Sequence, residues 1–187
     1  MFAQLFNKMK KFPISNYRAK RDNRLFVVTL AGEGATDYGG PYRDILSIAS
    51  EELHSNYLEL FIKSPNHKNE VGSLRDKYVI NPCAKSALYL DMYVFIGYLM
   101  GYAICSGYLL NLNLHPVIWK LILNQKIDFT EYETIDKLFY KLLLEVEKTE
   151  LKTLKDFEAS YDLTYVIQLS DGSEVELKNK GKNTQVS

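Results

Sequence analysis

Apolar residues recur at helical spacing along much of this chain. In the opening segment Phe2, Leu5, Phe6 and Met9 fall on one face of a helix, and Pro13 ends the pattern. After residue 128 a short helical turn leads into an amphipathic stretch with apolar residues on one side. We expect helices at 2–11, 41–53, 86–107 and 115–124, and the amphipathic helix after 128.

Other stretches show strand and turn signals. Residues 25–30 are apolar and β-branched, and 57–82 is typical of short strands and loops, with Ser-Pro-Asn and Ile-Asn-Pro as turns. Two β-rich runs near the end of the sequence flank an Asp-Gly turn at 170–173, which predicts a hairpin. The composition changes at about residue 128. We therefore predict a mostly helical α+β fold with a larger subdomain at 1–126 and a smaller one at 127–187.

The segment 92–114 has no charged residue and contains a GxxxG spacing formed by Gly97 and Gly101. A membrane-spanning helix is one interpretation. Against it, polar tips of tyrosine, serine and asparagine are spread through the segment and are not gathered in belts at its two ends. We therefore favour a core helix that packs closely through its two glycines, and we expect no membrane span.

Charge and cysteine content exclude several functional classes. Lys plus Arg and Asp plus Glu both total 23, so no net charge attracts nucleic acid. The only cysteines are Cys83 and Cys105, which fit reduced thiols in a cytoplasmic or nuclear protein without a signal peptide. The 3 histidines show no metal-ligand spacing. We expect neither a metal site nor a cofactor.

A Gly-rich turn, LAGEGATDYGGPYRD at 30–44, separates the predicted strand from the second helix. It lacks the Gly-Lys-Ser/Thr ending of a Walker loop, and Asp37 stands where the third glycine of a dinucleotide loop would be. Its residues suit a rigid corner with charges that pair at the helix entrance. The candidate structural residues are Gly32, Glu33, Gly34, Asp37, Gly39, Gly40 and Arg43.

The order of motifs resembles the domain of HECT-type ubiquitin ligases. The turn at 30–44 is similar to the GE-x-x-x-D-x-GG-x-x-RE element of that family, with Asp44 in place of the usual Glu. FIGYLMGYAI at 95–104 and LNLHPVIWKLIL at 112–123 resemble the next two blocks. DFTEYETIDKLFYKLL from 128 resembles the acidic helix entry, and ELKNKG from 176 resembles ELK-x-GG, with Lys180 replacing the first glycine.

The resemblance covers only part of the first and larger of the family's two lobes. In the family, a cysteine of the second lobe takes ubiquitin from an E2 conjugating enzyme as a thioester and passes it to a substrate lysine. Neither Cys83 nor Cys105 matches its Thr-Cys-Phe context, so we expect no catalytic residue in this chain. The family's substrates bind regions that precede the ligase domain.

The resemblance also implies a docking site for the E2 enzyme. In the family the E2 binds a groove made by the amphipathic helix, the following strand and a later aromatic helix. The matching positions here are Phe139, Leu142, Leu143, Tyr161 and Leu163. Packing within the small subdomain is the alternative for each, and it is as plausible as contact for the two leucines of the helix.

Some family members bind a regulatory ubiquitin on the first lobe. The loosely matching positions are Tyr57, Leu58 and Phe61, for which ordinary packing is the alternative. Two functions stay open from the sequence. One is part of a HECT-type ligase that docks E2 and ubiquitin, and the other is a non-catalytic scaffold or decoy that binds an E2 or ubiquitin.

Overall fold

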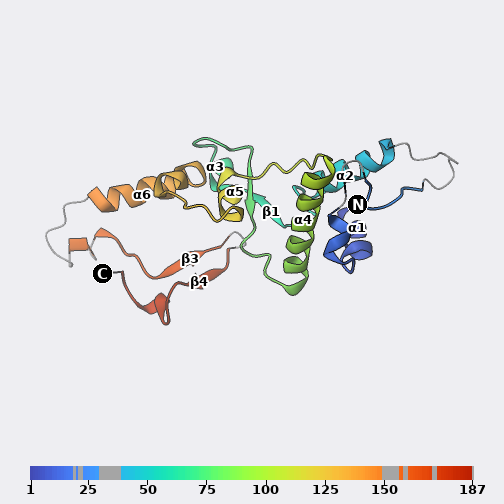
Figure 1. Ribbon diagram of the computed structural model, residues 1–187. Coiled ribbons are helices and arrows are strands. Elements are labelled where there is room, and N and C mark those ends of the chain that lie inside the picture. Colours follow the sequence, from blue (N-terminus) through green and yellow to red (C-terminus); the bar gives the residue numbers. More distant parts are fainter. Residues whose placement is uncertain are drawn as a thin grey trace. The chain divides into compact units, whose positions relative to one another are not determined.

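The computed structural model describes residues 1–18, 20, 23–29, 39–148, 156–157, 160–169 and 172–186 (Figure 1). The chain divides into two compact units. The first consists of Met1–Lys63, Asp76–Ile80 and Ala84–Trp119, and the second of Ser64–Arg75, Asn81–Cys83 and Lys120–Ser187. The second unit therefore includes a segment, Ser64–Arg75, that comes from the middle of the sequence. The subdomain boundary at 126/127 stays a prediction.

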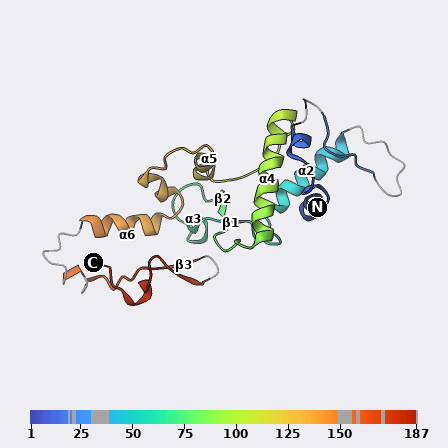
Figure 2. The same ribbon diagram turned by 60° about the horizontal axis from the view of Figure 1, so that its bottom comes forward.

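Helices dominate the first unit. They are α1 (Phe2–Met9), the 3-10 helix η1 (Ile14–Tyr17), α2 (Gly40–Glu52) and α4 (Ala87–Ser106), and α5 (Pro116–Ile122) begins in this unit. Both α1 and α2 lie beside the longer α4 (Figures 1 and 2). The helices expected in this part of the chain are thus confirmed; α1, α4 and α5 are slightly shorter than expected, and α2 begins and ends one residue earlier.

Aromatic side chains form the centre of the first unit's core. The ring of Phe95, on α4, lies 5.7 Å from Phe2, 5.6 Å from Phe6 and 6.3 Å from Tyr17. Leu46 on α2 and Leu99 on α4 are buried in the same cluster. Because burial of each such side chain contributes about 1.5–3 kcal/mol, this cluster is the main source of stability in the first unit.

The two ends of α4 are set by local sequence. The Ser86 hydroxyl accepts a hydrogen bond from the Tyr89 N–H at 3.4 Å, which satisfies one free donor of the first turn. At the other end Gly107 has φ 78°, and its N–H donates to the Ala103 carbonyl at 2.9 Å. A glycine takes this left-handed conformation without a steric penalty, so the helix ends there.

Helix α4 is long and apolar enough to cross a membrane by length and composition, but the core helix of a soluble protein passes the same test. One face of α4, including Met92, Ile96 and Tyr102, is buried in the first unit's core, so packing accounts for the apolar character of that face. The expectation of close packing through Gly97 and Gly101 is wrong. Both glycines are exposed, and a Cβ added to either would meet nothing within 4 Å.

The expected strand at 25–30 is not formed by residues 25–29, the part of it that the structure describes. The first two of these residues contact a tyrosine of α2 instead of a second strand. The Leu25 N–H donates to the Tyr42 hydroxyl at 3.2 Å, and the ring of Phe26 lies 4.6 Å from that of Tyr42. The Tyr42 hydroxyl donates in turn to that of Tyr102 at 2.7 Å, so the segment is fixed by α2 and α4.

The short strands expected within 57–82 are present. Strand β1 (Phe61–Lys63) pairs antiparallel with β2 (Tyr78–Ile80), with Phe61 opposite Ile80. Tyr78 also forms a parallel bridge to Leu114. The strands thereby connect the middle of the chain to the segment that leads into α5.

The second unit contains α3 (Pro65–Lys68), the 3-10 helix η2 (Phe129–Thr134) and α6 (Lys137–Lys148). It also contains β3 (Val166–Gln168), β4 (Glu174–Glu176) and the 3-10 helix η3 (Gly181–Asn183). The expected short helical turn followed by an amphipathic helix corresponds to η2 and α6.

The expected hairpin is confirmed, since β3 pairs antiparallel with β4. The Leu169 N–H donates to the Ser173 carbonyl at 2.8 Å, and Gly172 has φ 82°, as the turn requires. Residues 170–171 lie outside the described part of the chain. Helices with short antiparallel strand pairs confirm the predicted α+β class.

Candidate functional site

Helix α6 carries an apolar stripe that the second unit leaves open. Leu138 is 51% exposed, Phe139 50% and Leu142 39%, although all are apolar. No described residue of α6 is buried. Residues three and four apart share one side of a helix, so these side chains form a continuous surface along α6.

The opposite side of α6 packs on η2 through aromatic rings. The ring of Tyr140 lies 5.1 Å from that of Phe129, which lies 6.1 Å from Tyr132. Because the helix is held from this side, its apolar stripe faces away from η2.

Two side chains satisfy free N–H groups at the start of α6. Asp136 accepts from the Phe139 N–H at 3.0 Å, a local cap. The side-chain oxygen of Asn66 accepts from the Lys137 N–H at 2.7 Å, from a position 71 residues earlier in the sequence. The start of the helix is therefore fixed both by its own sequence and by the segment around α3.

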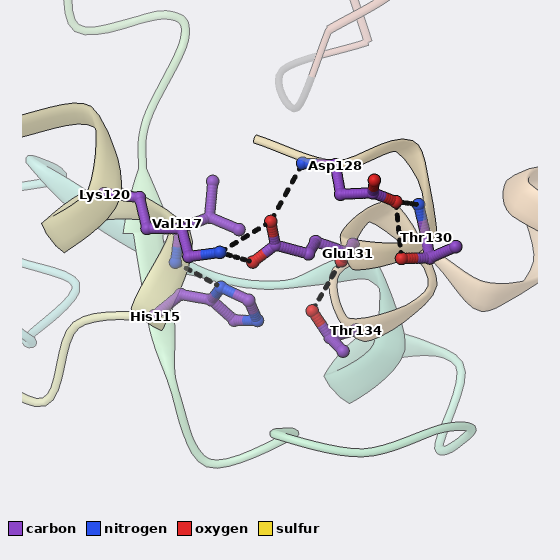
Figure 3. Close-up of polar contacts among 7 residues, drawn as sticks. All are labelled: His115, Val117, Lys120, Asp128, Thr130, Glu131 and Thr134. Carbon is purple, nitrogen blue, oxygen red and sulfur yellow. Dashed lines mark hydrogen bonds and ion pairs between the residues drawn. The ribbon is translucent and has the colours of Figure 1, made fainter. Parts of the chain in front are cut away.

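A capping box and an ion pair fix η2 ahead of α6 (Figure 3). Asp128 accepts from the Thr130 N–H at 2.9 Å, and Glu131 accepts from the Asp128 N–H at 2.9 Å. Lys120, near the end of α5, donates to Glu131 at 2.8 Å. The Thr134 hydroxyl donates to the Glu131 carbonyl at 2.6 Å. The aromatic support of α6 is thus attached to α5.

These contacts favour the ionised carboxylates. The hydrogen bond from the Thr130 side chain lowers the pKa of Asp128, and the bond from Lys120 lowers the pKa of Glu131. Both groups stay negatively charged at neutral pH and act here as hydrogen-bond acceptors of a structural turn.

The other predicted docking residues differ in their exposure. Leu143 on α6 is half-buried, whereas Leu163 is 36% exposed on the segment that precedes β3. Tyr161 is half-buried, and its ring lies 5.4 Å from that of Phe157. The structure thus places Phe139, Leu142 and Leu143 on one helix, and their joining with the other two in one groove stays a prediction.

The three candidate ubiquitin-binding positions do not form one surface. Tyr57 is 93% exposed, and Leu58 is half-buried against the core of the first unit. Phe61 is 5% exposed, and its ring contacts that of Tyr93 at 5.8 Å. Phe61 is therefore a core residue, which leaves Tyr57 as the accessible member of the set.

Part of the Gly-rich signature lies outside the described residues, namely Gly32, Glu33, Gly34 and Asp37. In the described part, Gly39 has φ 108° and precedes α2, which begins at Gly40. A Cβ on Gly39 would lie 3.1 Å from the guanidinium of Arg24. Arg43 is exposed and lines a cavity of about 430 Å³ with Ser47 and Asn111, among others. Because of this positive φ, the corner at Gly39 needs glycine for its backbone conformation.

The described residues contain no group of three or more His, Cys, Asp or Glu side chains that could hold a metal ion. Cys105 is exposed on α4, and Cys83 is half-buried. What the second unit offers chemically is an apolar surface on α6, so the arrangement is suited to binding a partner protein.

Sequence reasoning missed the role of Asn66. Its side chain is fully buried and hydrogen-bonded to the start of α6. The Ser-Pro-Asn signal indicated a turn at this position, but a hydrogen bond to a residue so distant in sequence leaves no local pattern. The exposed Leu138 lies in the expected amphipathic helix, but the sequence did not indicate it as part of a site.

Comparison with known proteins defines the class. Residues 47–187 match the family model described as "HECT-domain (ubiquitin-transferase)", which is most of the chain. The chain therefore belongs to the HECT family of ubiquitin ligases, as the order of motifs indicated.

Individual relatives are E3 ubiquitin-protein ligases. The chain is 30% identical over 180 residues to HERC2 of Mus musculus, an alignment that covers 96% of this chain and 4% of that protein. It is 29% identical over 171 residues to HECW1 of Mus musculus (88% and 10%) and 29% identical over 169 residues to HUWE1 of Rattus norvegicus (88% and 4%). The chain thus spans a small part of the length of these relatives.

Proposed function

We propose that this chain supplies the surface on which a HECT-type ligase docks an E2 conjugating enzyme that carries ubiquitin. Ubiquitin then passes to a cysteine of the ligase's second lobe, and substrates are chosen by other regions of the protein. The observation that carries this proposal is the exposed apolar stripe of α6, which includes Phe139 and Leu142.

A contiguous apolar surface of this kind is typical of a site that a partner protein covers. An aromatic ring beside leucine side chains is the composition of the few residues that contribute most binding energy in protein interfaces. The hydrogen bonds and ring contacts at the start of α6 hold the stripe in one orientation, which lowers the entropy lost on binding. The stripe therefore has both the apolar character and the rigidity of a docking surface.

Tyr161 and Leu163 would complete the docking surface next to the hairpin. Leu163 is bonded through its backbone, since its carbonyl accepts from the Val186 N–H at 2.8 Å, and its side chain stays exposed. Leu143 is half-buried and would contribute mainly by supporting Phe139. We expect Phe139 and Leu142 to make the strongest contacts.

A binding titration tests the site. We would screen a panel of E2 enzymes, each linked stably to ubiquitin, against the full chain and measure Kd for the best binder. Phe139→Ala should weaken binding by about 2 kcal/mol, or roughly thirty-fold, because it removes the central aromatic contact. Leu142→Ala should have a smaller effect in the same direction.

Two controls match these variants. Lys141→Ala changes an exposed polar residue of α6, and Leu109→Ala removes an apolar side chain that is 91% exposed in the first unit. Both should keep the original affinity. If Phe139→Ala binds the E2 as well as the unchanged chain does, α6 is not the docking surface.

A second interaction is favoured by Tyr57, which is 93% exposed. We propose it as a contact for a regulatory ubiquitin, with Leu58 supporting it. Tyr57→Ala should reduce binding of free ubiquitin, measured by chemical-shift titration, and leave E2 binding intact. Phe61 is not a suitable target for this test, since its loss would disturb the core.

Catalysis would depend on residues other than the two cysteines of this chain. Incubation with an E2 charged with ubiquitin should give no thiol-sensitive adduct on Cys83 or Cys105. An adduct that disappears in Cys105→Ser or Cys83→Ser would show that this part of the protein accepts ubiquitin directly.

A further inference from the structure

Asn66 is a buried polar residue with bonds to several segments of the second unit. Its side chain is 0% exposed. The amide nitrogen donates to the Glu133 carbonyl at 2.9 Å and lies 3.5 Å from the Ser73 carbonyl, and the amide oxygen accepts from the Lys137 N–H at 2.7 Å. The Asn66 backbone N–H donates to the Ile135 carbonyl at 3.0 Å.

These bonds meet at the junction between η2 and α6. Glu133 is in the last turn of η2, Ile135 follows it, and Lys137 is the first residue of α6. A primary amide has a donor and an acceptor side by side, so it can satisfy a carbonyl and an N–H of this junction at the same time. Neither aspartate nor leucine, which have a similar size, could do both at neutral pH.

Gly72 closes the other side of the amide. It has φ 70°, and a Cβ at this position would lie 2.7 Å from the Asn66 amide nitrogen and 3.0 Å from its Cγ. The loop can approach so closely only with glycine, and the Asn66 side chain is thereby limited to the orientation in which it bonds the junction.

The position of α6 matters for docking because successive residues of a helix are rotated by about 100°. A small change in where the helix begins would turn Phe139 away from its partner. Asp136 stabilises the first turn but lies next to α6 in sequence, so it cannot fix the helix relative to the rest of the unit. Asn66 can, because it lies in a different segment, which has hydrogen bonds of its own, such as the one from the Val71 N–H to the Asn66 carbonyl at 3.0 Å.

We infer that Asn66 is a positioning residue for E2 docking, which sets the orientation of the α6 stripe without touching the partner. This inference rests on the proposed function of α6. It predicts that the affinity for an E2 depends on Asn66 even when the chain is fully folded.

The test compares two ways of weakening the start of α6. Asn66→Ala removes the long-range bonds, Asn66→Asp keeps the acceptor for the Lys137 N–H, and Asp136→Ala removes only the local cap. Asn69→Ala, at an exposed position just after α3, is the matched control. For each variant we would measure thermal unfolding, amide exchange in α6 and the Kd for the ubiquitin-linked E2, at a temperature where the chain is folded.

We expect Asn66→Ala to weaken E2 binding at least about ten-fold, which corresponds to the loss of one or two buried hydrogen bonds. Asn66→Asp should weaken E2 binding less than Asn66→Ala does. Asp136→Ala should weaken it least, although this variant speeds amide exchange at the start of the helix. Asn69→Ala should bind like the unchanged chain. Graded recovery by Asn66→Asp is the result that a purely stabilising role would not produce.

Opposite results separate the two proposals. If folded Asn66→Ala keeps full affinity while Phe139→Ala loses it, the positioning role is wrong and the docking site stands. If Phe139→Ala keeps full affinity, the docking site is wrong and the positioning role falls with it. If Asn66→Ala does not fold, the Kd of Asn66→Asp decides: unchanged affinity overturns the inference and reduced affinity supports it.

Discussion

The two units of this protein bury different kinds of residue. In the described part of the chain, the buried hydrophobic side chains all belong to the first unit, with Phe95 and Leu99 near their centre. The residues classed as buried in the second unit are Ser64, Asn66 and Gly181. The first unit is thus built around an apolar core, whereas the second depends on hydrogen bonds and close backbone contacts.

This difference has a functional consequence. One face of α4, with Phe95, Ile96 and Leu99, is buried and stabilises the fold, whereas no described residue of α6 is buried and Leu138, Phe139 and Leu142 lie at the surface. A unit held together by polar contacts does not need these side chains for its own stability. They are available to a partner.

The largest change in stability should distinguish two phenylalanines, one from each unit. Phe95→Ala removes a ring that is 1% exposed and should lower the free energy of unfolding by about 3–5 kcal/mol. Phe139→Ala, at a ring that is 50% exposed, should change it by less than about 1 kcal/mol. Urea unfolding followed by circular dichroism measures both. Equal losses would show that α6 belongs to a core and not to a docking surface.

A smaller loss of stability should follow from adding one methyl group to the second unit. A Cβ on Gly181 would lie 2.4 Å from the Tyr165 carbonyl oxygen, a backbone atom that cannot rotate away. Gly181→Ala should therefore destabilise the region by about 1–3 kcal/mol. Amide exchange at Tyr165, whose N–H donates to the Gly181 carbonyl at 3.2 Å, reports the change. Gly97→Ala, where a Cβ meets nothing within 4 Å, is the control.

Replacing Lys180, the neighbour of Gly181, should give a modest gain in stability. Lys180 has φ 60°, a conformation in which glycine carries no steric penalty. Lys180→Gly, which restores the residue usual in the family, should stabilise the second unit by up to about 1 kcal/mol, less the greater freedom of glycine in the unfolded chain. Asn124→Gly, at φ 52° in the turn after α5, should act in the same direction. If Lys180→Gly loses stability instead, the Lys180 side chain stabilises the folded state by more than its backbone strain costs.

The smallest effect should be a pH dependence in the first unit. Burial lowers the pKa of His54, and its ring accepts from the Asn113 N–H at 3.1 Å, which requires the neutral form. Because the pKa of His54 is lower in the folded chain than in the unfolded chain, the folded state is at its full stability above the unfolded pKa of about 6.5. This stability is lost as the pH falls toward the lower folded value. The melting temperature should decline below that pH, and His54→Gln should flatten the slope. An identical slope in the variant would contradict the assignment.

The sequence predicted most helices because their signals are local. The spacing of Phe2, Leu5 and Phe6 and the capping residues Ser86 and Gly107 act within a few residues of one another. The strand expected at 25–30 failed in its described part because that apolar run packs on Tyr42, a contact that local pattern does not reveal. The same reason hid Asn66, whose partners are far away in the sequence.

The docking residues that we propose on α6 were predictable from the family motif, but their exposure was not. Apolar side chains at helical spacing indicate one apolar face and do not say whether the protein or a partner covers it. The burial of Phe61 and the exposure of Tyr57, which are only four residues apart, show the same limit.

By itself the sequence determined the HECT family, the α+β class and the order of helices and hairpin, because each depends on motifs and on periodicity within short windows. Only the tertiary structure decided which apolar residues are buried, that Gly97 and Gly101 are open to solvent, and that Asn66 holds the start of α6. The physical reason is that burial and buried hydrogen bonds are formed between segments distant in sequence, so they depend on the completed packing of the chain.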